Sequence, residues 1–231
     1  MKAAPEIYFR QLELGPMQNF VYVVADPVTR EAAVIDGAWD IDAIVHLAEA
    51  DDLKITKNLV THFHPDHLGG SLMGHNIPGA AELLARLSAK AYIHKAELPY
   101  LARLTGLSRT DVVPVDAGDT TSVGNITITF VHTPGHTPGS QCFLVENRLI
   151  SGDTLFIGSC GRVDLPGSDA AAMYHSLTGV LGAMPDDVAL YPGHNYAERP
   201  SSTIGDEKRT NAMMRFRSVK DFLAVMSPLS L

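Results

Sequence analysis

Residues 61–70 read THFHPDHLGG and place three histidines and one aspartate within six consecutive positions. These side chains, His62, His64, Asp66 and His67, directly follow the apolar run NLV, which is typical of a strand. The i, i+2 spacing of His62 and His64 lets both point to the same side of an extended segment. Three imidazoles and a carboxylate are costly to bury together unless a cation organises them, and they suit zinc, iron or manganese. The segment therefore predicts a metal site.

The same arrangement, a titratable side chain at the end of a predicted strand, recurs three times further along the chain. His136 lies in HTPGHTPGS after the ITITFV run, Asp153 closes LISGD, and His194 closes VALYPGH. Glycine and proline surround each of them, and such residues allow the tight turns that bring several side chains to one point. Loops at strand ends are also where binding groups are usually presented. We therefore expect the four segments to converge on one metal centre.

A histidine that stands alone in the sequence is expected to be a surface or hydrogen-bonded core residue rather than a ligand. Five histidines fall in this class: His46, His75, His94, His132 and His175.

Composition predicts an ordinary globular chain and excludes several kinds of partner. With 231 residues and 45% hydrophobic content, we expect one domain over residues 1–231. The net charge of −8 argues against nucleic acid, which favours a basic face. Charges in the first residues and the lack of a long apolar run argue against a secretory signal and a membrane span, and the two cysteines fit a reducing compartment. We therefore expect a cytoplasmic location.

Strand and helix patterns alternate along the chain and predict a layered α/β protein in which helices cover sheets. Residues 19–26 and 31–37 read as a hairpin, and residues 40–53 as a helix with Asp40 as its N-cap. Further strands are expected within 55–64, 121–133, 140–153 and 187–194, and further helices within 78–89 and 169–184. The segment from Ala91 to Thr110 is either an outer helix completing the core or a flap beside the metal cleft.

The ordered pattern His-x-His-x-Asp-His, then His, Asp and His, resembles the metallo-β-lactamase superfamily. That resemblance implies a four-layered αβ/βα sandwich with the metal site at one edge, between two sheets. It also implies one metal ion on His62, His64 and His136, a second on Asp66, His67 and His194, and Asp153 as a bridge between them. The expected cofactors are thus two divalent ions, zinc first, with iron or manganese as alternatives.

The stretch SGDTLFIGSCGRVDLPGSD, residues 151–169, resembles two branches of that superfamily, glyoxalase II and the persulfide dioxygenases. In both branches a Cys-Gly-Arg/Lys element lies near the thiol group of the substrate. On this resemblance Cys160, Arg162 and Asp164 are candidate substrate-binding residues. Residues 191–211, YPGHNYAERPSSTIGDEKRTN, are similar to the dioxygenases in particular. The substrate is therefore expected to be a small thiol-derived compound.

The first functional hypothesis is a metal-dependent hydrolase of a thioester or related ester, similar to hydroxyacylglutathione hydrolase. A metal-bound hydroxide would be the nucleophile, with Asp66 and Asp153 as catalytic carboxylates. The alternative is a dioxygenase acting on glutathione persulfide, in which His62, His136 and Asp153 hold a single iron(II). A third hypothesis is a binding or regulatory protein without turnover, and a dimer is possible under any of them. Covalent catalysis is disfavoured because no G-x-S-x-G element occurs and Cys160 lacks a nucleophile signature.

Overall fold

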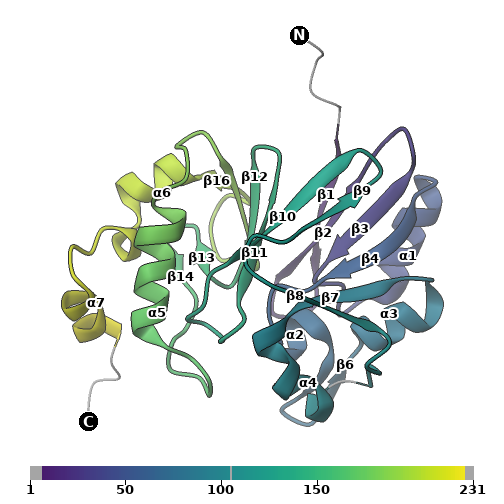
Figure 1. The fold of residues 1–231 in the computed structure, drawn as a ribbon, viewed down its shortest axis with the longest axis horizontal. Coiled ribbons are helices and arrows are strands. Elements are labelled where there is room, and N and C mark those ends of the chain that lie inside the picture. The colour runs from purple at the N-terminus through teal and green to yellow at the C-terminus, as the bar shows by residue number, and fades with distance from the viewer. Residues whose placement is uncertain (1–6, 105, 227–231) are drawn as a thin grey trace.

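The computed structural model describes residues 7–104 and 106–226. Two six-stranded sheets face each other, with helices on the outer face of each sheet, so that the chain forms four layers (Figure 1). The helices α1 and α3 lie beside the first sheet, and α5 and α6 lie beside the second (Figure 1). The predicted αβ/βα sandwich is therefore confirmed. Within the described residues, no helix is long and apolar enough to cross a membrane.

The first sheet has the strand order β1-β2-β3-β4-β7-β8. Its first three strands pair antiparallel, including the predicted hairpin of β2 and β3, and the pairs from β3 to β8 are parallel. The strand β1 was not predicted, because its sequence YFRQLEL leaves no residue fully buried and gives a weak strand signal. The strands span Tyr8–Leu14 (β1), Asn19–Ala25 (β2), Glu31–Ile35 (β3), Lys54–Leu59 (β4), Lys90–His94 (β7) and Val112–Val115 (β8).

The second sheet has the order β16-β15-β12-β11-β10-β9. All neighbours pair antiparallel except β12 and β15, which run parallel and so end at the same edge. Two small hairpins, β5–β6 and β13–β14, stand apart from both sheets. The strands span Thr120–Val123 (β9), Ile126–His132 (β10), Gln141–Val145 (β11), Arg148–Gly152 (β12), Ala189–Pro192 (β15), Ser202–Thr203 (β16), Gly70–Leu72 (β5), His75–Ile77 (β6), Leu155–Phe156 (β13) and Ser159–Cys160 (β14).

The predicted helices form, and their ends follow local signals. At the start of α1, the Asp40 side chain accepts a hydrogen bond of 2.9 Å from the Ala43 N–H, which confirms the predicted N-cap. The helix expected over 169–184 begins as α5 and continues as a π-helical segment, η2. The C-terminal helices α6 and α7 were not predicted. The helices span Ile41–Ala50 (α1), Pro65–Leu68 (α2), Ala80–Arg86 (α3), Lys95–Glu97 (η1), Leu98–Leu104 (α4), Ala170–His175 (α5), Ser176–Leu181 (η2), Ile204–Thr210 (α6), Ala212–Met214 (η3) and Val219–Met226 (α7).

The largest buried cluster lies between the two sheets and includes Phe130 and Phe143, whose rings pack edge to face at 5.4 Å. Separate clusters join the first sheet to α1 and the second sheet to α5, η2 and α7. Each fully buried aliphatic or aromatic side chain contributes roughly 1.5–3 kcal/mol. This packing fixes the sheets against each other and makes their shared edge a rigid support.

At that edge the ends of β4, β12 and β15 come together. The Gly193 N–H donates to the Gly152 carbonyl at 2.9 Å, and the Phe20 N–H donates to the Gly193 carbonyl at 2.8 Å, which links the second sheet to β2. Gly152 has φ +49°, and an added Cβ there would lie 2.6 Å from Cβ of Thr61. Only glycine combines this backbone conformation with so close an approach. The segment after β4 and the segment after β12 can therefore touch.

Candidate metal centre

Three of the predicted ligands meet at one point and are called here the three-histidine group: His62, His64 and His136. The distance from His62 Nε2 to His64 Nδ1 is 3.0 Å, and that from His136 Nε2 to His64 Nδ1 is 2.9 Å. His62 and His136 are buried, and His64 is half-buried. The first two come from the loop after β4 and the third from the loop after β10, so the group joins both sheets.

Beside it lies a second convergence, the Asp-His-His group, formed by Asp66, His67 and His194. His67 Nε2 lies 3.1 Å from His194 Nε2 and 3.3 Å from Asp66 Oδ2. All three side chains are buried. Asp66 and His67 belong to the short helix α2, and His194 follows β15.

Asp153, directly after β12, faces both groups. Its Oδ1 lies 3.3 Å from His67 Nε2 and 3.4 Å from His194 Nε2, while its Oδ2 lies 3.5 Å from His136 Nε2. Oδ1 is buried, and although both imidazole nitrogens lie within ion-pair distance of it, it accepts no hydrogen bond from the described residues. A buried carboxylate oxygen without a partner is costly, and a cation beside it would remove that cost.

The remaining ring nitrogens show which way the imidazoles are presented. His136 Nδ1 lies 2.8 Å from the Arg162 carbonyl, and His194 Nδ1 lies 2.9 Å from the Met17 carbonyl. Because a carbonyl can only accept, each Nδ1 is assigned as the protonated donor and the Nε2 lone pair faces the centre. Nitrogen ligands around tetrahedral zinc stand roughly 3.3 Å apart, close to the spacings seen here. The residues present thus fit metal ions.

Charge in the centre is unevenly spread. Burial, followed by the neighbouring imidazoles, lowers the pKa of His62 well below its usual value, and the same causes lower that of His64 to about 4. Burial also opposes a proton on His67, yet the carboxylates of Asp66 and Asp153 raise its pKa above the usual value. The two carboxylates therefore require positive charge between them, which a proton on His67 or a cation can supply.

Two supporting residues were missed by sequence reasoning, Asp36 and Asn19. The Asp36 carboxylate lies 2.9 Å from His67 Nδ1 and accepts the N–H and hydroxyl of Thr61, both at 2.7 Å. Asn19 donates to Asp66 Oδ2 at 3.0 Å. Asp36 ends the run EAAVID. The expectation that a titratable side chain at the end of a strand belongs to the metal centre, which indicated Asp153, would therefore also have indicated Asp36.

Of the candidate substrate residues, Arg162 contacts the three-histidine group through its backbone carbonyl. The Arg162 carbonyl bonds His136, while its exposed guanidinium makes a two-point ion pair with Asp164 at 2.8 and 2.9 Å. Gly161 leaves no room for a side chain, because an added Cβ would meet the Asp153 carbonyl oxygen. Burial raises the pKa of the half-buried Cys160 thiol to about 12, so a thiolate nucleophile is disfavoured.

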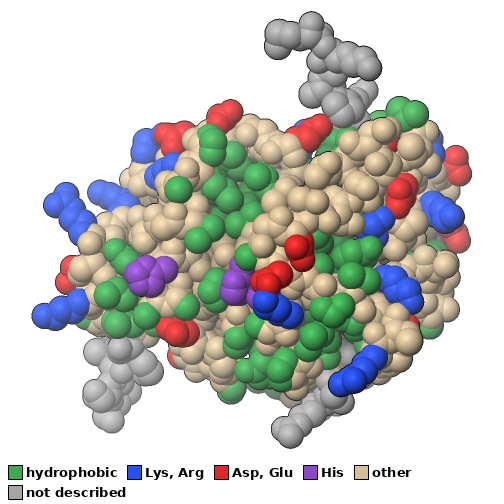
Figure 2. Space-filling model, viewed as in Figure 1, with side chains coloured by type: hydrophobic (Ala, Val, Ile, Leu, Met, Phe, Trp, Pro, Cys, Tyr) green, Lys and Arg blue, Asp and Glu red, His purple; other side chains and the backbone are tan. Residues whose placement is uncertain are grey.

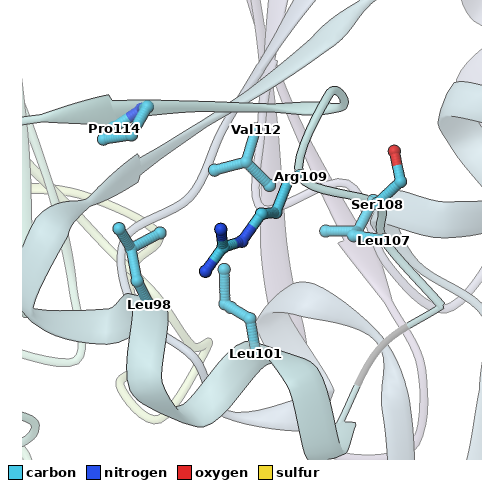
Figure 3. A pocket seen from close by; sticks show the side chains of 7 residues that line it. All are labelled: Leu98, Leu101, Leu107, Ser108, Arg109, Val112 and Pro114. Carbon is cyan, nitrogen blue, oxygen red and sulfur yellow. The ribbon is translucent and has the colours of Figure 1, made fainter.

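In the predicted segment 91–110, residues 91–104 form most of β7, η1 and α4, residues 106–110 lie in a loop, and both of its predicted roles retain support. Leu101 is buried in the core, whereas Tyr100 stacks on Phe63 at 4.4 Å, beside the metal centre. Between α4 and β8 lies a cavity of about 420 Å³, into which the Arg109 guanidinium points from above Leu101 (Figure 3). Hydrophobic side chains gather on this part of the surface (Figure 2). None of the seven predicted ligands lines that cavity.

The other five histidines lie outside the His/Asp groups found in the described part of the chain. Three are exposed: His46, His75 and His175. His94 and His132 stack on each other at 4.0 Å.

The profile of the Metallo-beta-lactamase superfamily matches residues 14–194. The chain belongs to this superfamily. Proteins of the metallo-β-lactamase superfamily bind metal ions, and the His and Asp groups of this chain can hold them.

Three relatives within the superfamily show how far the similarity extends. The probable polyketide biosynthesis zinc-dependent hydrolase BaeB of Bacillus velezensis is 28% identical over 89% of this chain and 85% of its own. The human mitochondrial persulfide dioxygenase ETHE1 is 29% identical over 97% of this chain and 82% of its own. The crystal structure of ETHE1 from Myxococcus xanthus superimposes with a TM-score of 0.82 at 31% identity, covering 97% of this chain and 92% of that one. The similarity to hydrolases and to dioxygenases is thus comparable.

Proposed function

We propose that this protein is a metal-dependent hydrolase of a thioester or a related ester, working with two divalent ions, preferably zinc. The observation that carries the proposal is Asp153, whose two carboxylate oxygens face different groups of ligand atoms. A carboxylate in that position suits a bridge between two ions. The proposed ligands are those of the three-histidine group and the Asp-His-His group, together with Asp153.

When bound, two such ions would activate a water molecule at neutral pH and polarise the carbonyl group of the substrate. The protein's part is to orient its ligands and to handle the proton. Asp66 and Asp153 carry carboxylate oxygens at the centre and are proposed to orient the attacking water, and Asp66, which faces the two histidines of its group through Oδ2, is proposed to accept its proton. Water then adds to the acyl carbon, the bond to sulfur breaks, and the departing thiolate is protonated.

Substrate recognition is proposed to use the segment after β13. Arg162 would meet an anionic part of the substrate, and Asp164 would orient the guanidinium through its two hydrogen bonds, 2.8 and 2.9 Å long. Cys160 would lie near the thiol portion of the substrate. A small thiol-derived molecule would fit such a site, with its acyl group at the metal centre and its charged part near the Arg162 guanidinium.

The second candidate is an iron(II) dioxygenase acting on glutathione persulfide, and the similarity to human persulfide dioxygenase over 97% of the chain favours it. Its iron would be held by His62, His136 and Asp153. In this structure, however, His64 Nδ1 lies 3.0 and 2.9 Å from the facing nitrogens of the two histidines. A third imidazole at that point would leave fewer open positions on iron than a two-histidine, one-carboxylate site. The seven-ligand pattern is similar in hydrolases and dioxygenases, however, so the first choice rests on Asp153, whose two oxygens face both groups.

The test is to prepare zinc-loaded and iron(II)-loaded protein and to assay each with S-lactoylglutathione and with glutathione persulfide. Hydrolysis needs a Lewis acid but no oxygen, so the zinc form should release thiol under anaerobic conditions. Asp153→Ala prepared in the same way is the control for adventitious metal. Oxygen uptake with persulfide by the iron form alone, without thioester cleavage by either form, would establish the dioxygenase instead.

A further inference from the structure

Glu97 is a buried carboxylate that joins the two loops carrying the three-histidine group. It ends η1, and its side chain is fully buried. Its Oε2 accepts the Phe63 N–H at 2.7 Å, and its Oε1 accepts the Thr137 hydroxyl at 3.0 Å and the Gly139 N–H at 2.5 Å. Phe63 lies between the two histidines of the first loop, and Thr137 directly follows the histidine of the second. One side chain therefore bonds both loops.

The chemistry of this position calls for a group that only accepts hydrogen bonds. All three partners donate, and within the described residues Glu97 forms no ion pair. Gly139 leaves space for the carboxylate, because an added Cβ would lie 2.5 Å from Glu97 Cγ. Burial raises the pKa of Glu97 to about 7, although the three hydrogen bonds oppose the rise. A buried carboxylate without a cation is costly, and these donors offset part of that cost.

A second contact ties the same region to the first loop. The residue after Glu97 begins α4, and in that helix the Tyr100 ring stacks on Phe63 at 4.4 Å with an interplanar angle of 3°. Phe63 in turn packs edge to face on His64 at 4.9 Å. The backbone of Phe63 is thus held by Glu97 and its ring by Tyr100.

We propose that Glu97 is a positioning residue for the metal centre, which fixes the separation of the two loops and so holds the facing nitrogens of the three-histidine group at ligand spacing. The inference rests on the metal centre of the proposed function and adds a residue that does not touch the metal. Glu97 acts through the backbone of Phe63 and Gly139 and the hydroxyl of Thr137.

The test compares zinc binding by the wild type and by Glu97→Gln, using apoprotein, a competing chelator, and a pH about one unit above the Glu97 pKa. Glutamine has one acceptor oxygen and one amide group that donates, so either the Phe63 or the Gly139 N–H loses its acceptor. The apparent Kd for zinc should rise about 10- to 100-fold. The visible absorption of the cobalt(II)-substituted protein should change as well, because it reports ligand geometry.

Glu207→Gln is the matched control. Glu207 is also fully buried and accepts a backbone N–H from Gly158, a hydroxyl from Ser202 and an amide from Asn211, but none of these residues belongs to the two loops. Both variants should lower Tm. Only Glu97→Gln should weaken zinc binding and shift the cobalt spectrum.

Unchanged zinc Kd and cobalt spectrum in Glu97→Gln, with a lower Tm, would show that Glu97 is merely structural and would overturn the inference. If Glu97→Gln fails to fold, Thr137→Val removes one of the three donors with less disturbance. The inference then requires a several-fold rise in zinc Kd, and a wild-type Kd overturns it. Failure of the wild type itself to bind zinc would instead refute the proposed function.

Discussion

Replacing Asp36 by Asn should weaken metal binding without unfolding the protein, although Asp36 is not one of the proposed ligands. Asp36 has φ +54°, a left-handed conformation that asparagine tolerates well, so the backbone should persist. Oδ1 accepts the Thr61 N–H, while Oδ2 accepts the Thr61 hydroxyl and lies 2.9 Å from His67 Nδ1. An amide can replace only one of these oxygens with an acceptor.

If the asparagine oxygen keeps the Thr61 N–H, its NH2 group faces His67 Nδ1. Nδ1 must then accept, and the ring proton moves to Nε2, the nitrogen that lies 3.1 Å from His194 Nε2 in the Asp-His-His group. A protonated Nε2 cannot bind a metal ion. In the opposite orientation the buried Thr61 N–H loses its acceptor, which costs about 1–3 kcal/mol. We expect an affinity loss of about 10- to 100-fold, equal to roughly 1.4–2.7 kcal/mol.

The assay is a chelator-competition titration with zinc, accompanied by thermal unfolding. Asp26→Asn is the control, because Asp26 is an equally buried turn aspartate that accepts the Val28 and Asn125 N–H groups, both at 2.8 Å, far along the chain from any proposed ligand. It should lower Tm and leave zinc Kd unchanged. A wild-type zinc Kd in Asp36→Asn would refute the reasoning that Asp36 sets the tautomer of His67.

Asp153→Ala should abolish activity and strongly lower metal content, because the carboxylate faces both groups, whereas His175→Ala, which removes an exposed side chain outside the ligand groups, should be nearly silent in both measurements. Arg162→Ala should raise KM more than about tenfold with metal content intact, and an unchanged KM for every active substrate would remove the guanidinium from substrate recognition. Trimming Leu98–Arg109 to a short glycine-containing turn should unfold the protein if this segment completes the core; a folded variant with a broadened substrate range would identify it as a flap. A lysine on β4 and a backbone N–H lower the pKa of Glu31 from 4.5 to about 2, so Glu31 adds stability above pH 4.5 that is lost as pH falls toward 2. Chemical denaturation across that range should show that the free energy of unfolding of Glu31→Gln depends less on pH than that of the wild type.

The α/β class and the candidate ligands could be predicted because they are encoded in local patterns, whereas the four-layered sandwich and the two metal groups were implied by the resemblance to the metallo-β-lactamase superfamily. The run THFHPDHLGG concentrates side chains that are costly to bury together without a cation. Each later candidate ligand stands at the end of an apolar strand. The hairpin of β2 and β3 follows from two β-rich runs separated by the turn DPVTR, and the helix α1 follows from apolar residues at helical spacing after the Asp40 cap. Each of these signals is confined to a few neighbouring residues and needs no tertiary information.

What could not be predicted depends on contacts between distant segments. Glu97 has no motif around it, and its role is visible only when Phe63 and Gly139, from different loops, meet its carboxylate. The helices α6 and α7 span only seven and eight residues, and Phe222 of α7 contributes to the cluster beside α5, a contact that the sequence alone does not show. Tertiary packing thus outweighs local propensity at these sites.

The most direct test of the account is the metal content of protein produced without metal supplementation, measured per chain and repeated after Asp153→Ala. A bridging carboxylate between two ligand groups predicts about two divalent ions per chain, predominantly zinc, and a strong loss of metal in the variant. About one iron per chain, with wild-type metal content retained when His64 or the Asp-His-His group is removed, would contradict the two-ion centre and support a single-iron dioxygenase.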